Sequence, residues 1–186
     1  PLSDYSSDSR RNLRSHFTFG ENDKKIMHLQ QALTLGTQKL AHLDQPNLEA
    51  EVLLAALLKK NRTWVKTHSE TKLGFWQQLK FRFGLRKRAQ HVPIAYITGQ
   101  VEWNDLILKV NHHTLIPRDE TETLCHHIFD SLSPCWGEPE GGKKRQILDI
   151  GTGSGCLAIW LKQQFPQSQA MALDIARPAL KVARTN

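Results

Sequence analysis

The stretch QILDIGTGSGCLAIWLKQQFPQSQAMALDIARPALKVARTN, residues 146–186, decides the fold of this chain. QILDI predicts a buried strand, and SGCLAIWLKQQF predicts a helix that Pro166 ends. QAMALDI predicts a second buried strand, and RPALKVARTN a second helix with Pro178 in its first turn. This order of elements indicates an α/β fold, a doubly wound parallel sheet with a right-handed crossover.

Three glycines at alternate positions, Gly151, Gly153 and Gly155, separate the first strand from its helix. A glycine turn there brings backbone N–H groups to a helix N-terminus, where ligands of open α/β folds bind. Asp174 closes the second strand, and a carboxylate at that place accepts hydrogen bonds from the hydroxyls of an adenosine ribose. The loop alone fits S-adenosylmethionine, a dinucleotide or a purely structural turn.

The spacing of the glycines separates the two cofactors. A dinucleotide fingerprint requires Gly or Ala at position 156, where this chain has Cys156. The run G-x-G-x-G, preceded by Asp149, is similar to motif I of class I methyltransferases. We therefore favour S-adenosylmethionine as the ligand of this loop.

Residues 24–90 predict a small all-helical domain, built from helical segments at 23–43, 46–61 and 75–90. Asp23 is the expected cap of the first segment. Apolar residues spaced by three or four predict one buried stripe on each segment: Ile26, Leu29, Leu33, Thr37 and Leu40; then Leu48, Val52, Ala55 and Leu58; then Trp76, Leu79 and Phe83.

The third segment also carries a basic cluster, Lys80, Arg82, Arg86, Lys87 and Arg88. Such a cluster could contact RNA or an acidic protein. It is also what an ordinary solvated helix face looks like, and we favour that interpretation.

Residues 91–145 predict a hairpin and a linker region. Asn104 and Asp105 lie between two apolar runs, which indicates a hairpin turn. DETETLCHHIFDSL, residues 119–132, predicts a helix with acids in its first turn, and residues 133–144 predict a loop. Residues 1–23 are polar without an apolar period and predict a flexible extension.

The composition is that of a globular domain, with 39% hydrophobic and 23% charged residues. No apolar run approaches the roughly 20 residues that span a bilayer, so no membrane association is expected. The net charge of +7 permits an anionic partner. Three cysteines and nine histidines show no chelating spacing, and we expect no metal site.

Four segments together resemble the HemK-type glutamine methyltransferases (the PrmC/HemK family): PIAYITG (93–99), IPRDETE (116–122), ILDIGTGSGCLAI (147–159) and ALDIARPALKVARTN (172–186). The resemblance covers residues 24–186. It implies a helical substrate-recognition domain followed by the start of a class I methyltransferase domain. The IPRxETE form resembles the branch that methylates the glutamine amide in the Gly-Gly-Gln motif of peptide chain release factors. Asp119 stands where the family usually has Pro.

The resemblance also implies roles for individual residues. The cofactor S-adenosylmethionine would lie with its methionine end on the loop and its ribose on Asp174. Asp149 would orient the loop or reach the cofactor amine through water. Arg118 and Glu122 would brace the site or form a salt bridge that holds the following helix. The loop residues concerned are Gly151, Thr152, Gly153, Ser154 and Gly155.

In this family the acceptors for the amide hydrogens come from an Asn-Pro-Pro-Tyr motif, which these residues lack. We therefore expect that no catalytic residue lies before Asn186 and that the chain is a truncated methyltransferase. Such a chain should bind the cofactor weakly and should not turn over. Two parallel strands alone would leave apolar faces and an edge exposed.

Two other functions remain open, an adenine-specific amino-methyltransferase acting on nucleic acid and a non-catalytic binding module. The partner implied by the resemblance is a release factor, bound through its Gly-Gly-Gln loop. We expect a monomer without direct nucleic-acid binding, located in the cytoplasm or, alternatively, in the mitochondrial matrix.

Overall fold

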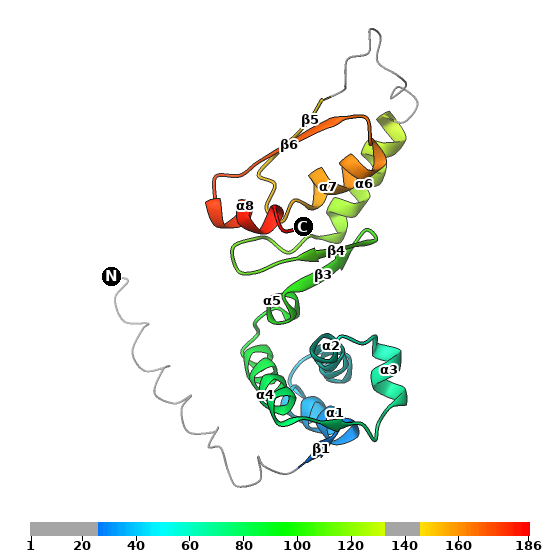
Figure 1. Ribbon diagram of the computed structural model, residues 1–186, viewed down its shortest axis with the longest axis vertical. Coiled ribbons are helices and arrows are strands. Elements are labelled where there is room, and N and C mark those ends of the chain that lie inside the picture. Colours follow the sequence, from blue (N-terminus) through cyan, green and yellow to red (C-terminus); the bar gives the residue numbers. More distant parts are fainter. Residues whose placement is uncertain (1–25, 133–145) are drawn as a thin grey trace, which may run out of the picture.

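A computed structural model describes residues 26–132 and 146–186. Helices form one end of the molecule and α/β structure the other, with a hairpin between them (Figure 1). The elements are β1 (Met27–His28), α1 (Leu29–Lys39), α2 (Pro46–Leu58), α3 (Arg62–Thr67), β2 (Lys72–Leu73), α4 (Phe75–Ala89), α5 (Ile94–Thr98), β3 (Gln100–Trp103), β4 (Leu106–Lys109), α6 (Asp119–Leu132), β5 (Gln146–Ile150), α7 (Cys156–Gln164), β6 (Gln169–Leu173) and α8 (Arg177–Ala183). Within the described ranges, no helix has both the length and the apolar character needed to cross a bilayer.

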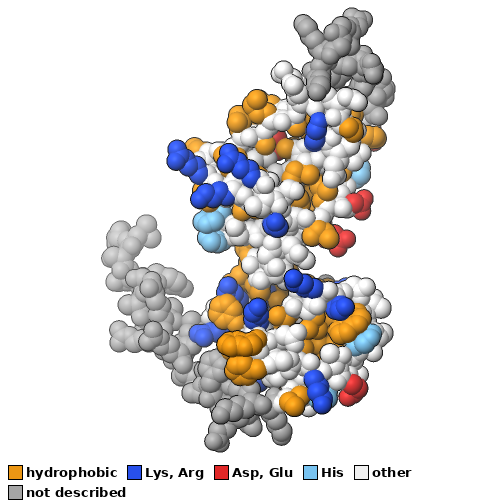
Figure 2. Space-filling view, viewed as in Figure 1, with side chains coloured by type: hydrophobic (Ala, Val, Ile, Leu, Met, Phe, Trp, Pro, Cys, Tyr) orange, Lys and Arg blue, Asp and Glu red, His pale blue; other side chains and the backbone are white. Residues whose placement is uncertain are grey.

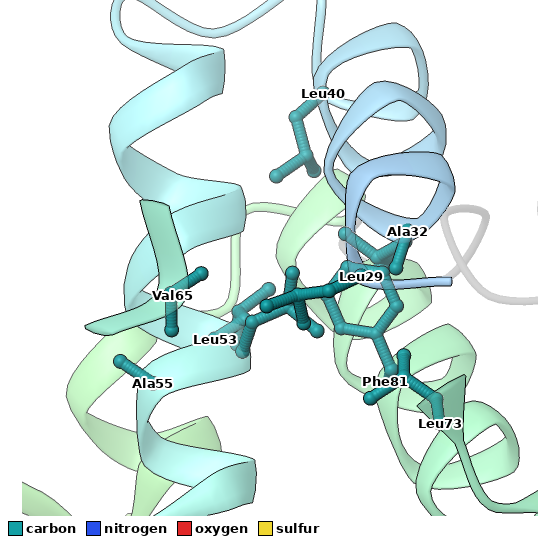
Figure 3. Packing of buried hydrophobic residues seen from close by; sticks show 10 residues of the cluster. Leu29, Ala32, Leu40, Leu53, Ala55, Val65, Leu73 and Phe81 are labelled. Atoms are coloured by element: carbon teal, nitrogen blue, oxygen red, sulfur yellow. The ribbon is translucent and has the colours of Figure 1, made fainter. Parts of the chain in front are cut away.

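The helical end is organised around α2, which contacts α1, α3, α4 and α5. Leu29, Leu53 and Phe81 point toward one another in its core (Figure 3). The single stripe predicted for α2 is wrong, because a central helix buries apolar residues on several sides. Its buried residues are Ala50, Leu53, Leu54 and Ala55.

The first helix starts later than predicted. Met27 and His28 pair with β2, so the chain is extended there and α1 begins at Leu29. Ile26 is exposed and not helical, and the predicted cap Asp23 lies outside the described residues. The buried face of α1 contains Gly36, where an added Cβ would lie 2.6 Å from Ala50 Cβ. Close approach of α1 to α2 therefore depends on this glycine.

The stripe predicted for α4 is also wrong. Trp76 is 70% exposed and Phe83 is 58% exposed, whereas Phe81 and Leu85 are buried. The face of α4 that packs on α2 includes Gly84, whose Cβ position is 3.6 Å from Leu53 Cδ2. Periodicity cannot separate two partly apolar faces of one helix, and here the neighbouring helix decides between them.

The hairpin prediction is confirmed. β3 and β4 pair antiparallel, with Trp103 opposite Leu106. Asn104 and Asp105 both have left-handed backbone, with φ of 47° and 63°. Positive φ at both central residues is typical of a type I′ turn, which Asn and Asp tolerate without a glycine.

The α/β end contains the predicted parallel pair. β5 and β6 are parallel neighbours, from Gln146 opposite Gln169 to Ile150 opposite Leu173, and α7 connects them. The helix predicted at residues 119–132 is α6, which packs against α7. A second core joins the hairpin to α6 and α7, and Ile147 of β5 packs against it. Its buried residues are Trp103, Leu108, Cys125, Trp160, Leu161 and Phe165. The fold is thus a helical domain followed by a hairpin and a Rossmann-like strand–helix–strand–helix unit with a parallel sheet.

The prediction that both strands are buried is wrong. All of β6 is exposed, and in β5 only Asp149 is buried. Side chains alternate along a strand, so one face of the pair lies toward α7 and the other away from it. Four residues of the second face are 47–76% exposed, Leu148, Ile150, Met171 and Leu173. The predicted loop at 133–144 lies outside the described residues.

Candidate functional site

The glycine loop between β5 and α7 has a left-handed backbone at each glycine. The φ angles of Gly151, Gly153 and Gly155 are 81°, 56° and 86°. A Cβ added at Gly151 would have no atom within 4 Å, and one at Gly153 would approach only a backbone oxygen at 4.0 Å. The backbone here faces open space, so a ligand can approach it closely.

Hydrogen bonds to Asp149, which is buried, and to the backbone of Leu173 hold the loop. The hydroxyl of Thr152 donates to Asp149 Oδ2 at 2.7 Å. The N–H groups of Gly151 and Thr152 both donate to the carbonyl of Leu173, at 2.8 and 2.9 Å. The bond from Thr152 connects Asp149 to the loop, which fits the first of the two roles considered for it.

Asp174 follows the last residue of β6 and contacts the glycine loop from the neighbouring strand. Its Oδ1 accepts the N–H of Ala176 and its Oδ2 accepts the N–H of Gly153, both at 2.8 Å. These two hydrogen bonds, Ala176 first, lower the pKa of the Asp174 carboxyl, so it stays ionised at neutral pH. A carboxylate has about four acceptor positions, so it has room for ligand hydroxyls as well.

Gly155 and Ser154 face inward instead. A Cβ at Gly155 would lie 3.2 Å from Ile159 Cδ1 and 3.3 Å from Ala183 Cβ, so this glycine lets α8 pack against the start of α7. Ser154 is buried. The six residues predicted from sequence thus lie together: Gly151, Gly153 and Asp174 face outward, while Thr152, Ser154 and Gly155 shape the loop.

Sequence reasoning missed Asn186. Its Nδ2 donates to the carbonyls of Ser154 at 2.9 Å and Lys109 at 3.0 Å, and its Oδ1 accepts the N–H of Lys109 at 2.7 Å. One side chain therefore ties strand β4 of the hairpin to the glycine loop. No sequence pattern indicates this, because the bonds join residues up to 77 positions apart.

The structure places Arg118 and Glu122 beside the hairpin. Glu122 Oε1 accepts the N–H of Asn104 at 2.8 Å, and the carbonyl of Arg118 accepts Nε1–H of Trp103 at 3.1 Å. Both residues fasten the start of α6 to the hairpin turn. These contacts of Arg118 and Glu122 position the hairpin relative to α6, and they do not involve the glycine loop.

The described cysteines are packing residues. Burial raises the pKa of the Cys125 thiol to about 11 and also raises that of Cys156. Both therefore stay protonated and poorly nucleophilic at neutral pH. Cys135 lies outside the described residues. Among residues 26–132 and 146–186, no three His, Cys, Asp or Glu side chains are grouped to hold a metal ion.

A glycine loop after a parallel strand, with a carboxylate at the end of the next strand, is a ligand site of open α/β folds, class I methyltransferase domains among them. Family comparisons agree: residues 31–99 match the PrmC N-terminal domain, and residues 133–186 match the methyltransferase small domain. These two matches and the relatives below support a protein of the HemK/PrmC type.

Several curated relatives are similar to this chain. A release factor glutamine methyltransferase of Deinococcus radiodurans is 34% identical over 162 residues, which are 86% of this chain and 56% of the relative. One from Coxiella burnetii is 40% identical over 141 residues, 76% of this chain and 48% of the relative. A bifunctional methyltransferase of Rickettsia bellii is 35% identical over 179 residues, a match that covers 85% of this chain and 32% of the relative. The chain spans about half the length of the release factor glutamine methyltransferases.

Proposed function

We propose that this chain serves the transfer of a methyl group from S-adenosylmethionine to a glutamine side-chain amide. The substrate is the Gly-Gly-Gln motif of a peptide chain release factor. The observation that carries the proposal is the open backbone at Gly151 and Gly153 beside the ionised carboxylate of Asp174. Relatives that are named release factor glutamine methyltransferases support the choice of substrate.

The cofactor-binding residues of this proposal divide into two groups. Gly151 and Gly153 expose backbone to the methionine end of the cofactor, and Asp174 accepts hydrogen bonds from the ribose hydroxyls. The other three, Thr152, Ser154 and Gly155, keep the loop in shape. The bound cofactor supplies a methyl group already activated by its sulfonium, so the reaction requires no metal.

The contribution of the described residues to the reaction is positioning. The lone pair of an amide nitrogen is delocalised into its carbonyl, so the nitrogen is a poor nucleophile. Holding donor and acceptor in line lowers the barrier by several kcal/mol without a covalent intermediate. A fixed loop provides this for the donor, because Asp149, Leu173 and Asp174 each bond it.

The remaining assignments follow from the same proposal. The domain at 24–90 recognises the release factor, the hairpin and linker region at 91–145 connects it to the methyltransferase domain at 146–186, and residues 1–23 form an extension. The protein works as a monomer in the cytoplasm, in translation termination.

Cofactor binding is tested by calorimetry with S-adenosylhomocysteine, the methyl-free product. Gly151→Ala places a methyl group where the ligand would lie and should weaken binding at least tenfold. Gly99→Ala is a matched control, because Gly99 has φ of 78° and no atom within 4 Å of its Cβ position. It should cost the same stability and leave affinity within twofold. Equal affinity loss in both variants, or no binding by the unchanged chain, would refute the cofactor site.

The substrate is tested separately, with radiolabelled S-adenosylmethionine and a purified release factor. The chain is assayed as it is and fused to the remaining half of the Coxiella relative. Label should enter the factor with the fusion, and none should enter a factor whose Gly-Gly-Gln glutamine is replaced by alanine. Labelling of adenine in DNA by the same fusion, with the factor unlabelled, would favour the nucleic-acid amino-methyltransferase instead.

A further inference from the structure

Two segments that are distant in sequence are rich in positive charge, and the carboxylate of Asp174 borders the second one through its bond to the N–H of Ala176. Residues 106–118 and 175–186 together contain five Lys or Arg, two His and no Asp or Glu. The structure brings them side by side, since Lys109 Nζ donates to the carbonyl of Thr185 at 3.0 Å. The bonds between Lys109 and Asn186 add to this contact.

A cavity of about 530 Å³ lies where the two segments meet. Val110, Pro178 and Val182 supply apolar lining, and Lys109, His113 and Lys181 supply charged or titratable groups. Figure 2 shows Lys and Arg side chains gathered over α8 with His side chains beside them, and no acidic side chain among them on the face in view. We name this the α8 basic surface: Lys109, His112, His113, Arg177, Lys181 and Arg184.

The spacing of the cations suits a chain of phosphates. Arg177 and Lys181 of α8 and Arg184, its C-cap residue, follow one another at steps of four and three, so they lie along one side of the helix and its end. At 1.5 Å per residue they extend over about 10 Å. Even in duplex DNA, where phosphates follow one another at about 3.4 Å along the axis of each strand, this length exceeds one phosphate step, so the row can contact more than one phosphate of a polynucleotide.

The basic cluster of α4 is a weaker candidate. Arg88 forms a bidentate ion pair with Glu49, in which Nε donates to Oε2 at 2.8 Å and Nη2 donates to Oε1 at 2.7 Å. Part of that cluster's charge is thus neutralised inside the helical domain. On the α8 basic surface, Lys109 Nζ donates to the backbone carbonyl of Thr185. This carbonyl is neutral, so the contact leaves the positive charge of Lys109 in place.

We propose that the α8 basic surface binds the phosphate backbone of single-stranded RNA. The binding is independent of base sequence and depends strongly on salt, because the surface offers cations rather than groups that read base edges. This goes beyond the proposed methyl transfer to a protein, and it departs from the sequence-based expectation of no direct nucleic-acid contact. The convergence of the two segments exists only in the folded chain.

The test uses fluorescence anisotropy with the whole 186-residue chain and a labelled oligouridine of about 20 nucleotides, long enough to cover a site of ~4–16 nucleotides. Affinity is measured in a salt series. The test variant is Lys181→Gln with Arg184→Gln. The matched control, Lys59→Gln with Lys72→Gln, removes the same charge from exposed positions in the helical domain. Unfolding midpoints confirm that both variants fold, and Arg177→Gln supplies an independent single change.

The expected results are specific. The test variant loses affinity about tenfold or more, and its salt dependence falls by about 1.4 in slope, or ~0.7 for each lost phosphate contact on a single strand. The control changes affinity less than threefold. Arg177→Gln lowers the slope by about 0.7.

Four outcomes would overturn the proposal. They are no RNA binding by the unchanged chain, equal losses in test and control variants, competition by uridine monophosphate at equal phosphate concentration, and competition by polyglutamate at equal charge. The third would assign the cavity to a small phosphorylated molecule, and the fourth would assign the surface to an acidic protein. None of these results bears on S-adenosylhomocysteine binding, so failure here is distinguishable from failure of the proposed function.

Discussion

Asp174 and Gly153 are joined by a hydrogen bond that spans 21 residues, in which the glycine N–H donates to Asp174 Oδ2 at 2.8 Å. The bond connects the end of β6 to the loop that follows β5. The carboxylate proposed to hold the ribose is thereby also a support of the glycine loop. In the proposed function, one side chain therefore contributes both to cofactor affinity and to the stability of the loop.

Asp174→Asn tests this coupling through its pH dependence. Because the pKa of Asp174 is lowered in the fold, its charge contributes stability above the unfolded pKa of about 3.9. This contribution is lost as pH falls through the folded pKa. The variant should have a lower urea midpoint than the unchanged chain at pH 7, and the difference should shrink at pH 3. Asp105→Asn, in the hairpin turn, is the control; a difference independent of pH would contradict the prediction.

Gly155→Ala and Gly151→Ala separate backbone strain from steric overlap. Both glycines have left-handed φ, which costs a non-glycine residue roughly 1–2 kcal/mol. Only at Gly155 does the new Cβ also press on Ile159 and Ala183. We expect Gly155→Ala to lose about 1 kcal/mol more than Gly151→Ala in urea unfolding followed by circular dichroism. Equal losses would show that α8 does not pack on this glycine.

Two glycines of the helical domain should respond to alanine with opposite signs. Gly36→Ala brings Cβ to 2.6 Å from Ala50 Cβ, so α1 must move from α2 at a cost of about 1–3 kcal/mol. At Gly84 the nearest atoms are at 3.4 Å or more, and a helix interior gains about 0.5–1 kcal/mol from alanine. Thermal and urea unfolding check both; stabilisation by Gly36→Ala would overturn the described packing.

The ion pair between Arg88 and Glu49 should contribute more than an exposed one. Its side chains are 17% and 18% exposed, and both guanidinium contacts are short. Donation of hydrogen bonds to the Glu49 carboxylate also raises the pKa of Arg88. A double-mutant cycle with Arg88→Met and Glu49→Gln should give a coupling of about 1–2 kcal/mol. The pair of Arg62 with Glu51, whose arginine is 48% exposed, should give below about 1 kcal/mol.

The exposed face of the two-stranded sheet should limit solubility. Leu148 and Met171 are opposite each other in register and both are largely exposed. Replacing both with Thr keeps strand propensity and removes apolar surface, so stability should change by less than about 1 kcal/mol. Light scattering after size exclusion should show less association. Glu102→Gln on the exposed side of the hairpin is the control, and unchanged association would show that another surface is responsible.

Local sequence patterns were sufficient wherever the structure depends on neighbouring residues. The parallel pair, its connecting helix, the hairpin turn at Asn104 and Asp105, and the acid-capped α6 all form as expected. The six loop and strand-end residues lie together because motif spacing along a strand and turn translates directly into position.

Sequence patterns predicted the wrong buried face wherever an element distant in sequence determines which face is buried. Trp76 and Phe83 are as apolar as Phe81, yet only Phe81 packs beneath α2. Ile26 continues the helical period, but pairing of β1 with β2 takes its neighbours into a strand. The contacts of Asn186 with Lys109 and Ser154 have no local signature at all.

The sequence by itself determined the order of elements, the methyltransferase family and the residues of the glycine loop. These depend on backbone preference and local spacing, which act over a few residues. Only the tertiary structure decided which helix faces are buried, that Asp174 supports the loop at Gly153, and that Lys109 bonds to Thr185 just after α8. Burial and charge clustering are sums over neighbours in space, and the folded chain alone defines those neighbours.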